Sequence, residues 1–161
     1  MRTSVVFCTG LLLGSVIATG LAQGSRLSGE NYVNHVGMAV ENFDEAFKFY
    51  TQKMGFPEAF TVKDASGKPT LAYVQASKNT FVELQQANAT RKPGLNHFGL
   101  HVQNLKAVVA TLKERGVMVD EVRVRPDDSS VANATDPNGI RIEMFEFGPG
   151  SPQGKAIAGW K

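Results

Sequence analysis

The sequence predicts an α+β protein made of two tandem βαβββ modules, at residues 32–86 and 95–147. Two observations lead to this prediction. Residues 34–40, which read NHVGMAV, return at residues 96–102 as NHFGLHV, and residues 80–84 return at residues 139–144. In each copy, segments that alternate like strands surround one segment with helical spacing. A repeat of this kind indicates one supersecondary unit used twice.

The elements of the first module follow from hydrophobic periodicity. Residues 33–40 alternate as a strand, and apolar residues over 43–54 recur at the spacing of an amphipathic helix that ends near Gly55. Strands follow at residues 58–63, 70–76 and 80–86, separated by polar turns. The short polar segment at 23–31 is read as a leader into this module.

The second module repeats the order. A strand at 95–102 precedes a helix with Asn104 as its N-cap and Gly116 at its end. Strands are then predicted at residues 117–125, 129–134 and 140–147, the last one after a turn at residues 136–139. The tail, residues 148–161, is predicted to be irregular because it opens with closely spaced glycine and proline.

Residues 1–22 resemble a secretory signal peptide. Arg2 precedes an apolar run, and small residues lead to a cleavage site after Ala22. The alternative is an uncleaved membrane anchor, for which the run is short and broken by polar residues. We therefore expect export to the periplasm or the medium, with no membrane contact after cleavage. Cleavage also removes Cys8, the single cysteine, and with it any disulfide or thiolate ligand.

Composition excludes several classes of partner. The chain has 161 residues, of which 42% are hydrophobic, and a formal net charge of +2 from 17 Lys+Arg and 15 Asp+Glu. These charges are interspersed, so no basic stripe is available for a nucleic-acid backbone. A small-molecule partner is expected instead.

Strand alternation places four ionisable residues on the polar faces of their strands. His35 and His97 lie opposite the apolar face of the first strand in each module, and Glu83 and Glu143 do the same on the last strand. Two imidazoles and two carboxylates suit a divalent ion such as Zn, Ni, Co, Mn or Fe(II), and are too rich in nitrogen for a Ca site. Taken singly, each residue is more often structural or solvated. Their recurrence in both copies favours a metal centre.

These motifs resemble the vicinal oxygen chelate superfamily, which includes glyoxalase I, extradiol dioxygenases, methylmalonyl-CoA epimerase, fosfomycin-resistance enzymes and bleomycin-binding proteins. The resemblance implies an incomplete barrel of paired βαβββ modules with the metal inside. The metal-ligand positions of the superfamily fall on His35, His97 and Glu143. Glu83, in the segment FVEL, matches the fourth ligand of the glyoxalase I-like branch. Were the modules to pair across a homodimer, as in many relatives, two subunits would supply the site.

That branch implies a lyase or isomerase, similar to lactoylglutathione lyase, that transfers a proton next to a metal-chelated carbonyl of a small substrate. Because of the predicted signal peptide, we expect this enzyme to be exported. Either Glu83 or Glu143 could serve as the base, and Glu143 is preferred. His101 shares their predicted face and is either a substrate contact or an ordinary strand histidine. Arg123 and Arg141 are candidates to receive a substrate carboxylate, and Arg125 is a further one.

Three alternatives remain at this point. An extradiol-type dioxygenase would use Fe(II) and keep its metal without Glu83. A non-catalytic protein that binds a small molecule or drug would bind without turnover, and a secreted structural protein would purify without metal. Glutathione adducts are mostly cytosolic, whereas this chain carries an export signal, so the sequence leaves the substrate open.

Overall fold

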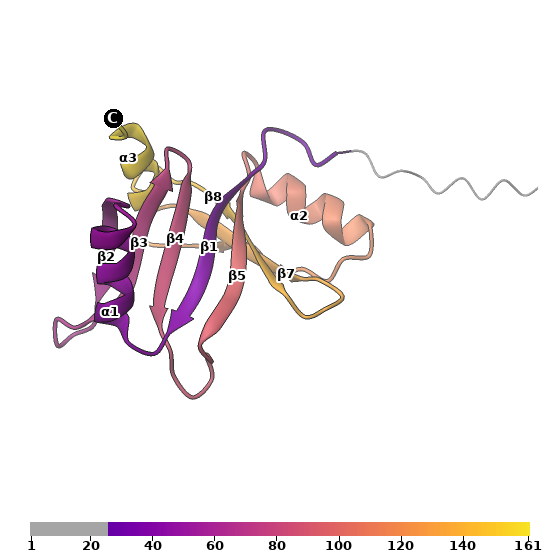
Figure 1. Ribbon diagram of the computed structural model, residues 1–161. Helices are drawn as coiled ribbons and strands as arrows, with labels where there is room; N and C mark the ends of the chain where they lie inside the picture. The colour runs from indigo at the N-terminus through magenta and orange to yellow at the C-terminus, as the bar shows by residue number, and fades with distance from the viewer. Residues whose placement is uncertain (1–25) are drawn as a thin grey trace, which may run out of the picture.

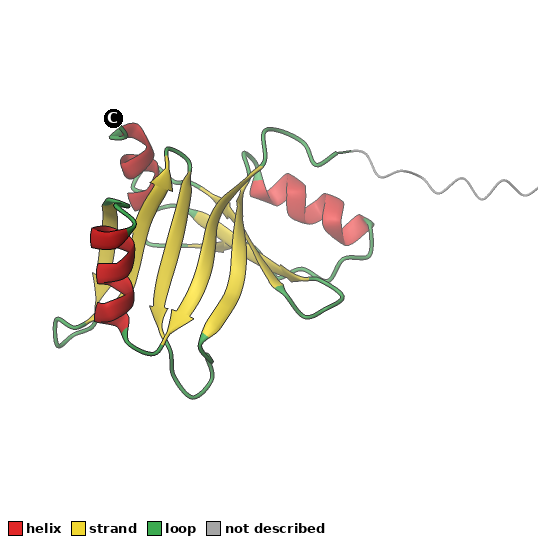
Figure 2. Cartoon of the chain, in the orientation of Figure 1, coloured by secondary structure: helices red, strands yellow, loops and turns green. Residues whose placement is uncertain are grey.

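One open sheet of eight strands, in the order β2-β3-β4-β1-β5-β8-β7-β6, organises the molecule. The computed structural model describes residues 26–161. The predicted signal peptide and the start of the leader lie outside the described residues. The sheet twists strongly between its two halves, and each half carries its own helix (Figures 1 and 2). The predicted α+β class and the incomplete barrel are therefore confirmed.

The first module has the predicted order of elements. They are β1 (Tyr32–Val40), α1 (Phe43–Lys48), η1 (Phe49–Lys53), β2 (Glu58–Lys63), β3 (Pro69–Ser77) and β4 (Thr80–Gln86). The single helix expected over 43–54 is an α-helix that continues as a π-helical turn. Asn42 caps it by accepting a hydrogen bond from the Glu45 N–H at 3.2 Å.

The second module repeats this arrangement. Its elements are β5 (Gly94–His101), α2 (Leu105–Glu114), β6 (Arg123–Val124), β7 (Ser130–Thr135) and β8 (Arg141–Glu146). Asn104 caps α2 by accepting a hydrogen bond from the Ala107 N–H at 3.0 Å. Gly116 follows α2 with a φ of +76°, the left-handed conformation that commonly ends a helix.

The two modules meet where β1 pairs with β5 in antiparallel fashion. On either side of this seam, β1 runs parallel to β4 and β5 runs parallel to β8. The arrangement is a pseudo-twofold repeat about the seam. Within one chain, the residues at the seam come from both modules.

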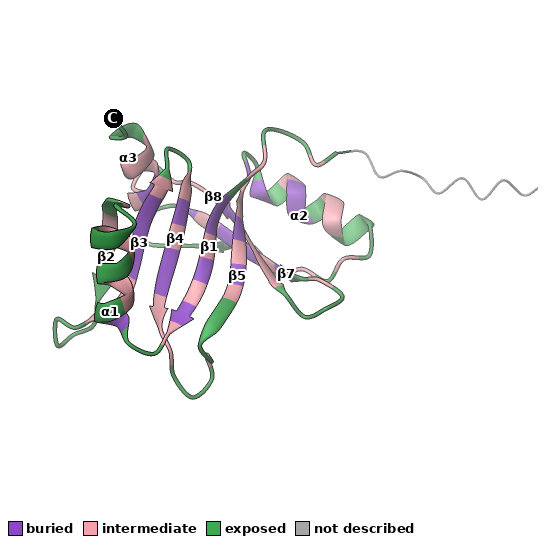
Figure 3. Ribbon diagram, viewed as in Figure 1, coloured by how far each residue is buried: buried purple, intermediate pink, exposed green. Residues whose placement is uncertain are grey.

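The helices bury the apolar face of the sheet, as the alternation predicts. Beneath α1, buried Ala72 and Leu84 pack with Phe43. Beneath α2, a larger cluster is buried, which comprises Val102, Leu105, Val108, Val109, Ala132, Ala134 and Met144. Buried segments follow the central strands (Figure 3). The opposite face is left free to carry polar side chains.

The predicted strand over 117–125 is wrong for most of its length. The structure has the two-residue strand β6 and one isolated bridge between Val119 and Ala134. β6 is the edge of the sheet, and Met118 and Val124 are exposed there. Very short edge strands leave little backbone available for pairing with another chain.

The tail is also different from the prediction, because residues 152–158 are not irregular. They form α3 (Pro152–Ala158), which packs against β2. The Ser151 hydroxyl accepts a hydrogen bond from the Gly154 N–H at 3.2 Å, and Pro152 occupies the first turn. A serine N-cap followed by proline is a helix-start signal in the sequence. The neighbouring glycines and prolines obscured it.

Across residues 26–161, the helices are all too short or too polar to traverse a lipid bilayer.

Replacing a core leucine measures how much the module depends on its helix-to-sheet packing. We expect Leu84→Ala to lower the free energy of unfolding by about 2–5 kcal/mol, because Leu84 is fully buried beneath α1. Met118→Ala is the control, since Met118 is 85% exposed, and it should change stability by less than about 0.5 kcal/mol. Urea unfolding measures both values, and equal losses would contradict this account of the core.

Candidate metal centre

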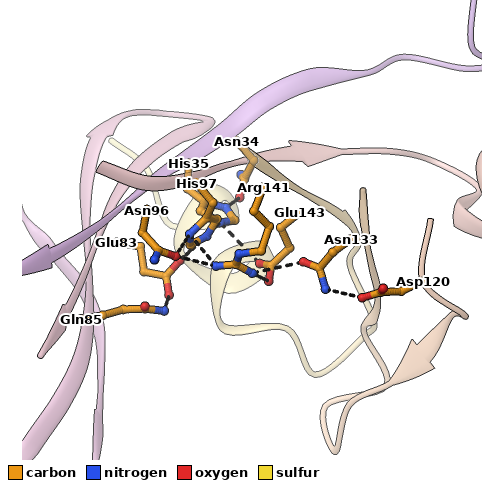
Figure 4. A network of polar contacts seen from close by, with 10 residues as sticks. All are labelled: Asn34, His35, Glu83, Gln85, Asn96, His97, Asp120, Asn133, Arg141 and Glu143. Carbon is orange, nitrogen blue, oxygen red and sulfur yellow. Dashed lines mark hydrogen bonds and ion pairs between the residues drawn. The ribbon is translucent and has the colours of Figure 1, made fainter. Parts of the chain in front are cut away.

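Four side chains from the four central strands converge at the seam. One potential ligand atom from each of His35, Glu83, His97 and Glu143 lies within 4.8 Å of the others (Figure 4). The two Nε2 atoms of the histidines are 3.0 Å apart. Glu83 Oε2 lies 3.3 Å from His35 Nε2 and 3.1 Å from His97 Nε2. Glu143 Oε2 lies 3.5 Å from His35 Nε2. The four residues predicted as metal ligands therefore do meet.

Two glycines make this convergence sterically feasible. Across the seam, His35 pairs with Gly99 and Gly37 pairs with His97. A Cβ atom built on Gly37 would lie 2.0 Å from His97 Cε1, and one built on Gly99 would lie 2.0 Å from His35 Cε1. No real side chain tolerates such a contact. Each module thus provides the space that the histidine of the other module occupies, and the open space expected beside these glycines is filled by imidazole.

The residue before each histidine orients the ring. Asn34 Oδ1 lies 3.2 Å from His35 Nδ1, and Asn96 Oδ1 lies 3.0 Å from His97 Nδ1. An amide oxygen only accepts hydrogen bonds, so this contact favours the hydrogen on Nδ1 of His35. The Asn34 amide is itself held because its Nδ2 donates to the Asn79 carbonyl at 3.1 Å. At His97, Arg141 Nη2 lies 2.7 Å from Nδ1 and can only donate, so this Nδ1 is an acceptor. The Nε2 atoms of both rings face the centre, where a metal would bind.

The donor atoms fit a divalent cation better than they fit one another. Glu83 Oε2 is a buried oxygen with no hydrogen-bond partner among the described residues. Such a buried, unpaired carboxylate oxygen is costly. Bonds of about 2.0–2.2 Å to one ion would hold the donor atoms roughly 3 to 3.5 Å apart. The four separations given above, from 3.0 to 3.5 Å, lie in that range, and all four ligand atoms lie within 4.8 Å of one another.

Both carboxylates are held in the ionised form that binds metal. Burial alone would raise the pKa of Glu83, but the close approach of His97 and His35 to its carboxylate lowers it. For Glu143, burial is again opposed by a hydrogen bond and charge from His35, and further by His97 and Arg141, which lower its pKa to about 2. The two carboxylates differ in access. The Glu83 side chain is 4% exposed and that of Glu143 is 14% exposed.

A polar cavity of about 390 Å³ opens beside the cluster. Its lining residues are Leu71, Tyr73, Glu83, Gln85, Thr90, Arg91, Asn96, Arg125, Arg141 and Glu143. Glu83 and Glu143 connect the cavity with the histidines, and Tyr73, which is buried beside Glu83, has its pKa raised well above the ordinary value by that burial. A cavity with convergent polar groups and perturbed carboxylates is the expected form of a small-molecule site.

The arginines are placed differently from the prediction. Arg141 lines the cavity, but its Nη atoms donate to Asn96 Oδ1 at 2.9 Å, Asn133 Oδ1 at 3.1 Å and Glu143 Oε1 at 3.3 Å. Its Nη2 also donates to His97 Nδ1 at 2.7 Å. Arg141 thus orders the cluster. Arg123, on the edge strand β6, is exposed and is not among the lining residues.

Two other arginines line the cavity and are placed to contact a substrate, the role that the prediction gave to Arg123 and Arg141. Arg125 reaches the cavity from the turn after β6, and Arg91 reaches it from the linker between the modules. Arg125 was only a further candidate to receive a substrate carboxylate, and Arg91 was not predicted. Nothing in the local sequence marks Arg91, because its position depends on how the linker folds over the sheet.

His101 lies on the predicted face but outside the cavity. Its ring stacks between Tyr32, at a centroid distance of 4.8 Å, and Phe147, at 4.4 Å. It is not among the lining residues of the cavity. Its pKa is lowered by burial, which disfavours the imidazolium. The structure therefore supports the alternative of an ordinary strand histidine over a substrate contact.

Sequence comparison agrees with this architecture. Residues 32–144 match the model of a family described as the Glyoxalase/Bleomycin resistance protein/Dioxygenase superfamily. The chain belongs to this superfamily. The matched residues span both modules and include all four residues of the cluster. Among curated proteins, none matches the chain.

Solved structures of this superfamily fold resemble the chain at low identity. Methylmalonyl-CoA epimerase from Mycobacterium tuberculosis has a TM-score of 0.62 at 22% identity, covering 73% of this chain and 88% of the epimerase. A hypothetical protein from Bacillus halodurans C-125 has a TM-score of 0.61 at 19% identity, covering 73% and 95%. A Streptomyces coelicolor methylmalonyl-CoA epimerase variant in complex with 2-nitronate-propionyl-CoA has a TM-score of 0.60 at 20% identity, covering 73% and 95%. At these identities the likeness shows the fold alone.

The lowered pKa of Glu143 predicts a pH dependence of stability in the metal-free protein. Its folded-state value of about 2 lies below the ordinary value of 4.5, so the stabilisation is complete above pH 4.5 and is lost as the pH falls toward 2. The free energy of unfolding of the wild type should exceed that of Glu143→Gln by roughly 3 kcal/mol at pH 6, and the difference should shrink by pH 3. Urea unfolding at both pH values measures it. A difference that does not change with pH would contradict the assignment.

Proposed function

We propose that this protein is a metal-dependent enzyme that moves a proton next to a carbonyl group of a small substrate, as an isomerase, epimerase or lyase. One observation carries the proposal: two imidazole and two carboxylate donors meet at a polar cavity, with the more exposed carboxylate facing it. His35, His97, Glu83 and Glu143 would hold the ion. A bound divalent ion would polarise the carbonyl and stabilise the negative charge that develops as the proton leaves.

The surroundings of the carboxylates assign them different roles. Glu83 is almost fully buried, and its Oε1 accepts a hydrogen bond from Gln85 Nε2, so it is suited to stay in place as a ligand. Glu143 lines the cavity and has the greater access to a bound substrate. Arg141 donates to Glu143 Oε1 and sets its orientation. We assign Glu143 as the general base, which accepts the substrate proton and returns it.

The comparisons support this reaction class without identifying the substrate. The superfamily includes metal-dependent enzymes, and several solved neighbours are epimerases whose ligands are CoA thioesters. Lactoylglutathione lyase-like activity is the finer alternative within the same class. Export, the homodimer and the small-molecule partner stay predictions, and so does the identity of the ion among Zn, Ni, Co, Mn and Fe(II).

Metal content tests the centre directly. Wild-type protein should bind about one divalent ion per chain, and His97→Ala should lose it, because removing one of four donors typically costs most of the affinity. Elemental analysis after dialysis measures this, with Co(II) absorption as a second readout. The matched control is His101→Phe, which keeps the ring stack on Tyr32 and Phe147 and should retain the ion. Wild type without metal, or equal loss in both variants, would contradict the proposal.

Proton exchange tests the reaction. Two substrates are incubated with metal-loaded wild type in D₂O: methylmalonyl-CoA, and the hemithioacetal of methylglyoxal and glutathione. The α-proton of at least one of them should exchange with solvent, and ¹H NMR measures the exchange. Glu143→Gln should lower the exchange rate by about 10²–10⁴-fold, the contribution usual for a general base. Its metal content is measured alongside, so that loss of the base is distinguished from loss of the ion. Oxygen consumption with a catechol would identify a dioxygenase instead. Tight binding with no exchange would identify a binding protein.

A further inference from the structure

The charges around the cavity do not balance once a cation is present. Two carboxylates, Glu83 and Glu143, line the cavity together with three guanidinium groups, those of Arg91, Arg125 and Arg141. A divalent ion at the cluster would neutralise the two carboxylates. The positive charge of the arginines would then remain without a counter-charge in the lining. A cavity of one sign of charge attracts ligands of the opposite sign.

Arg125 is the guanidinium with the most unused donors. Its Cζ lies 5.4 Å above the centre of the Phe145 ring, which is buried and forms a fixed platform. Within residues 26–161, no protein acceptor takes a hydrogen bond from this guanidinium, in contrast to the four made by Arg141. The backbone at Arg125 is held at both ends of its turn, because its N–H donates to the Ser129 carbonyl at 2.8 Å and its own carbonyl accepts from Asp128 at 3.0 Å.

Arg91 reaches the cavity from the linker between the two modules. Its Nη1 donates to the Gln86 carbonyl at 3.2 Å, which leaves the remaining guanidinium donors available. The loop around it is ordered by Asn88, whose Oδ1 accepts hydrogen bonds from the N–H groups of Thr90 and Arg91 at 2.9 and 2.8 Å. Arg91 is half-buried and lines the cavity together with Thr90. The ordered loop and the hydrogen bond to Gln86 therefore hold the Arg91 side chain at the cavity wall.

We propose that Arg91 and Arg125 form an oxyanion subsite, and that the substrate is a carbonyl compound carrying a carboxylate or phosphate away from its reacting end. This inference rests on the proposed function, because it takes the reacting end to lie at the metal. The planar fork of a guanidinium pairs with either anion through two parallel hydrogen bonds. Arg141 is excluded from this role since Asn96, Asn133 and Glu143 already occupy its donors.

Three hydroxamates with a common chelating head test the subsite. Butanohydroxamate has an uncharged tail, succinate monohydroxamate ends in a carboxylate, and 3-phosphonopropanohydroxamate ends in a phosphonate. Each is titrated into Co(II)-loaded protein, and the change in Co(II) absorption gives the dissociation constant. We expect at least one anionic probe to bind about tenfold or more tightly than butanohydroxamate, because charge-assisted hydrogen bonds to arginine have roughly that value.

Variants assign the preference to its residues. Arg91→Gln combined with Arg125→Gln should remove most of the preference for the anionic probe, while the affinity for butanohydroxamate and for Co(II) stays the same. Arg123→Gln is the matched control, since Arg123 is exposed on β6 outside the cavity lining, and the preference should persist. Raising the salt concentration should weaken the anionic probe more than the uncharged one.

The outcomes separate the two proposals. Equal affinity for charged and uncharged probes, each changing the Co(II) spectrum, would overturn the oxyanion subsite and leave the metal centre in place. A preference that survives the double substitution would also overturn it, because the anion would then be held elsewhere. Failure to bind Co(II) at all would overturn the proposed function, on which the subsite rests.

Discussion

The structure depends on a reciprocal contact across the seam, in which the histidine of each module occupies the space above the glycine of the other. This contact requires antiparallel pairing of β1 with β5 in one register, since His35 faces Gly99 and His97 faces Gly37. A shift of one of these strands by one residue would turn its imidazole to the face of the sheet opposite the other imidazole. The pairing that completes the sheet therefore also brings the two imidazoles together.

Burying these polar groups is costly, and the surrounding residues offset part of that cost. Asn34 holds Nδ1 of His35, Arg141 donates to Nδ1 of His97, and Arg141 also links Asn96 to Glu143. At the centre, one Glu83 oxygen has no hydrogen-bond partner among the described residues, and the two Nε2 atoms lie 3.0 Å apart. A network that is complete on its outer side and unsatisfied at its centre is the arrangement expected of a ligand cage, because a cation supplies the missing partner.

The symmetry of the two modules ends at the cavity wall. The cluster takes one histidine and one glutamate from each half, whereas the lining arginines come from the linker and from the second module. Core packing constrains the duplicated strands, while the linker and the β6–β7 turn lie at the surface and can vary without disturbing that core. Under the proposed function, the symmetric seam would carry the chemistry and the asymmetric segments would select the substrate.

Strand alternation and the internal repeat are local patterns, so they were enough to predict the order of elements, the apolar faces beneath the helices and the meeting of two histidines with two glutamates. The lining of the cavity by Arg91 and Arg125, the stacking of His101 between aromatic rings and the helix at residues 152–158 on β2 came only from the folded chain. Each of these depends on contacts between segments distant in sequence, and local periodicity carries no information about such contacts.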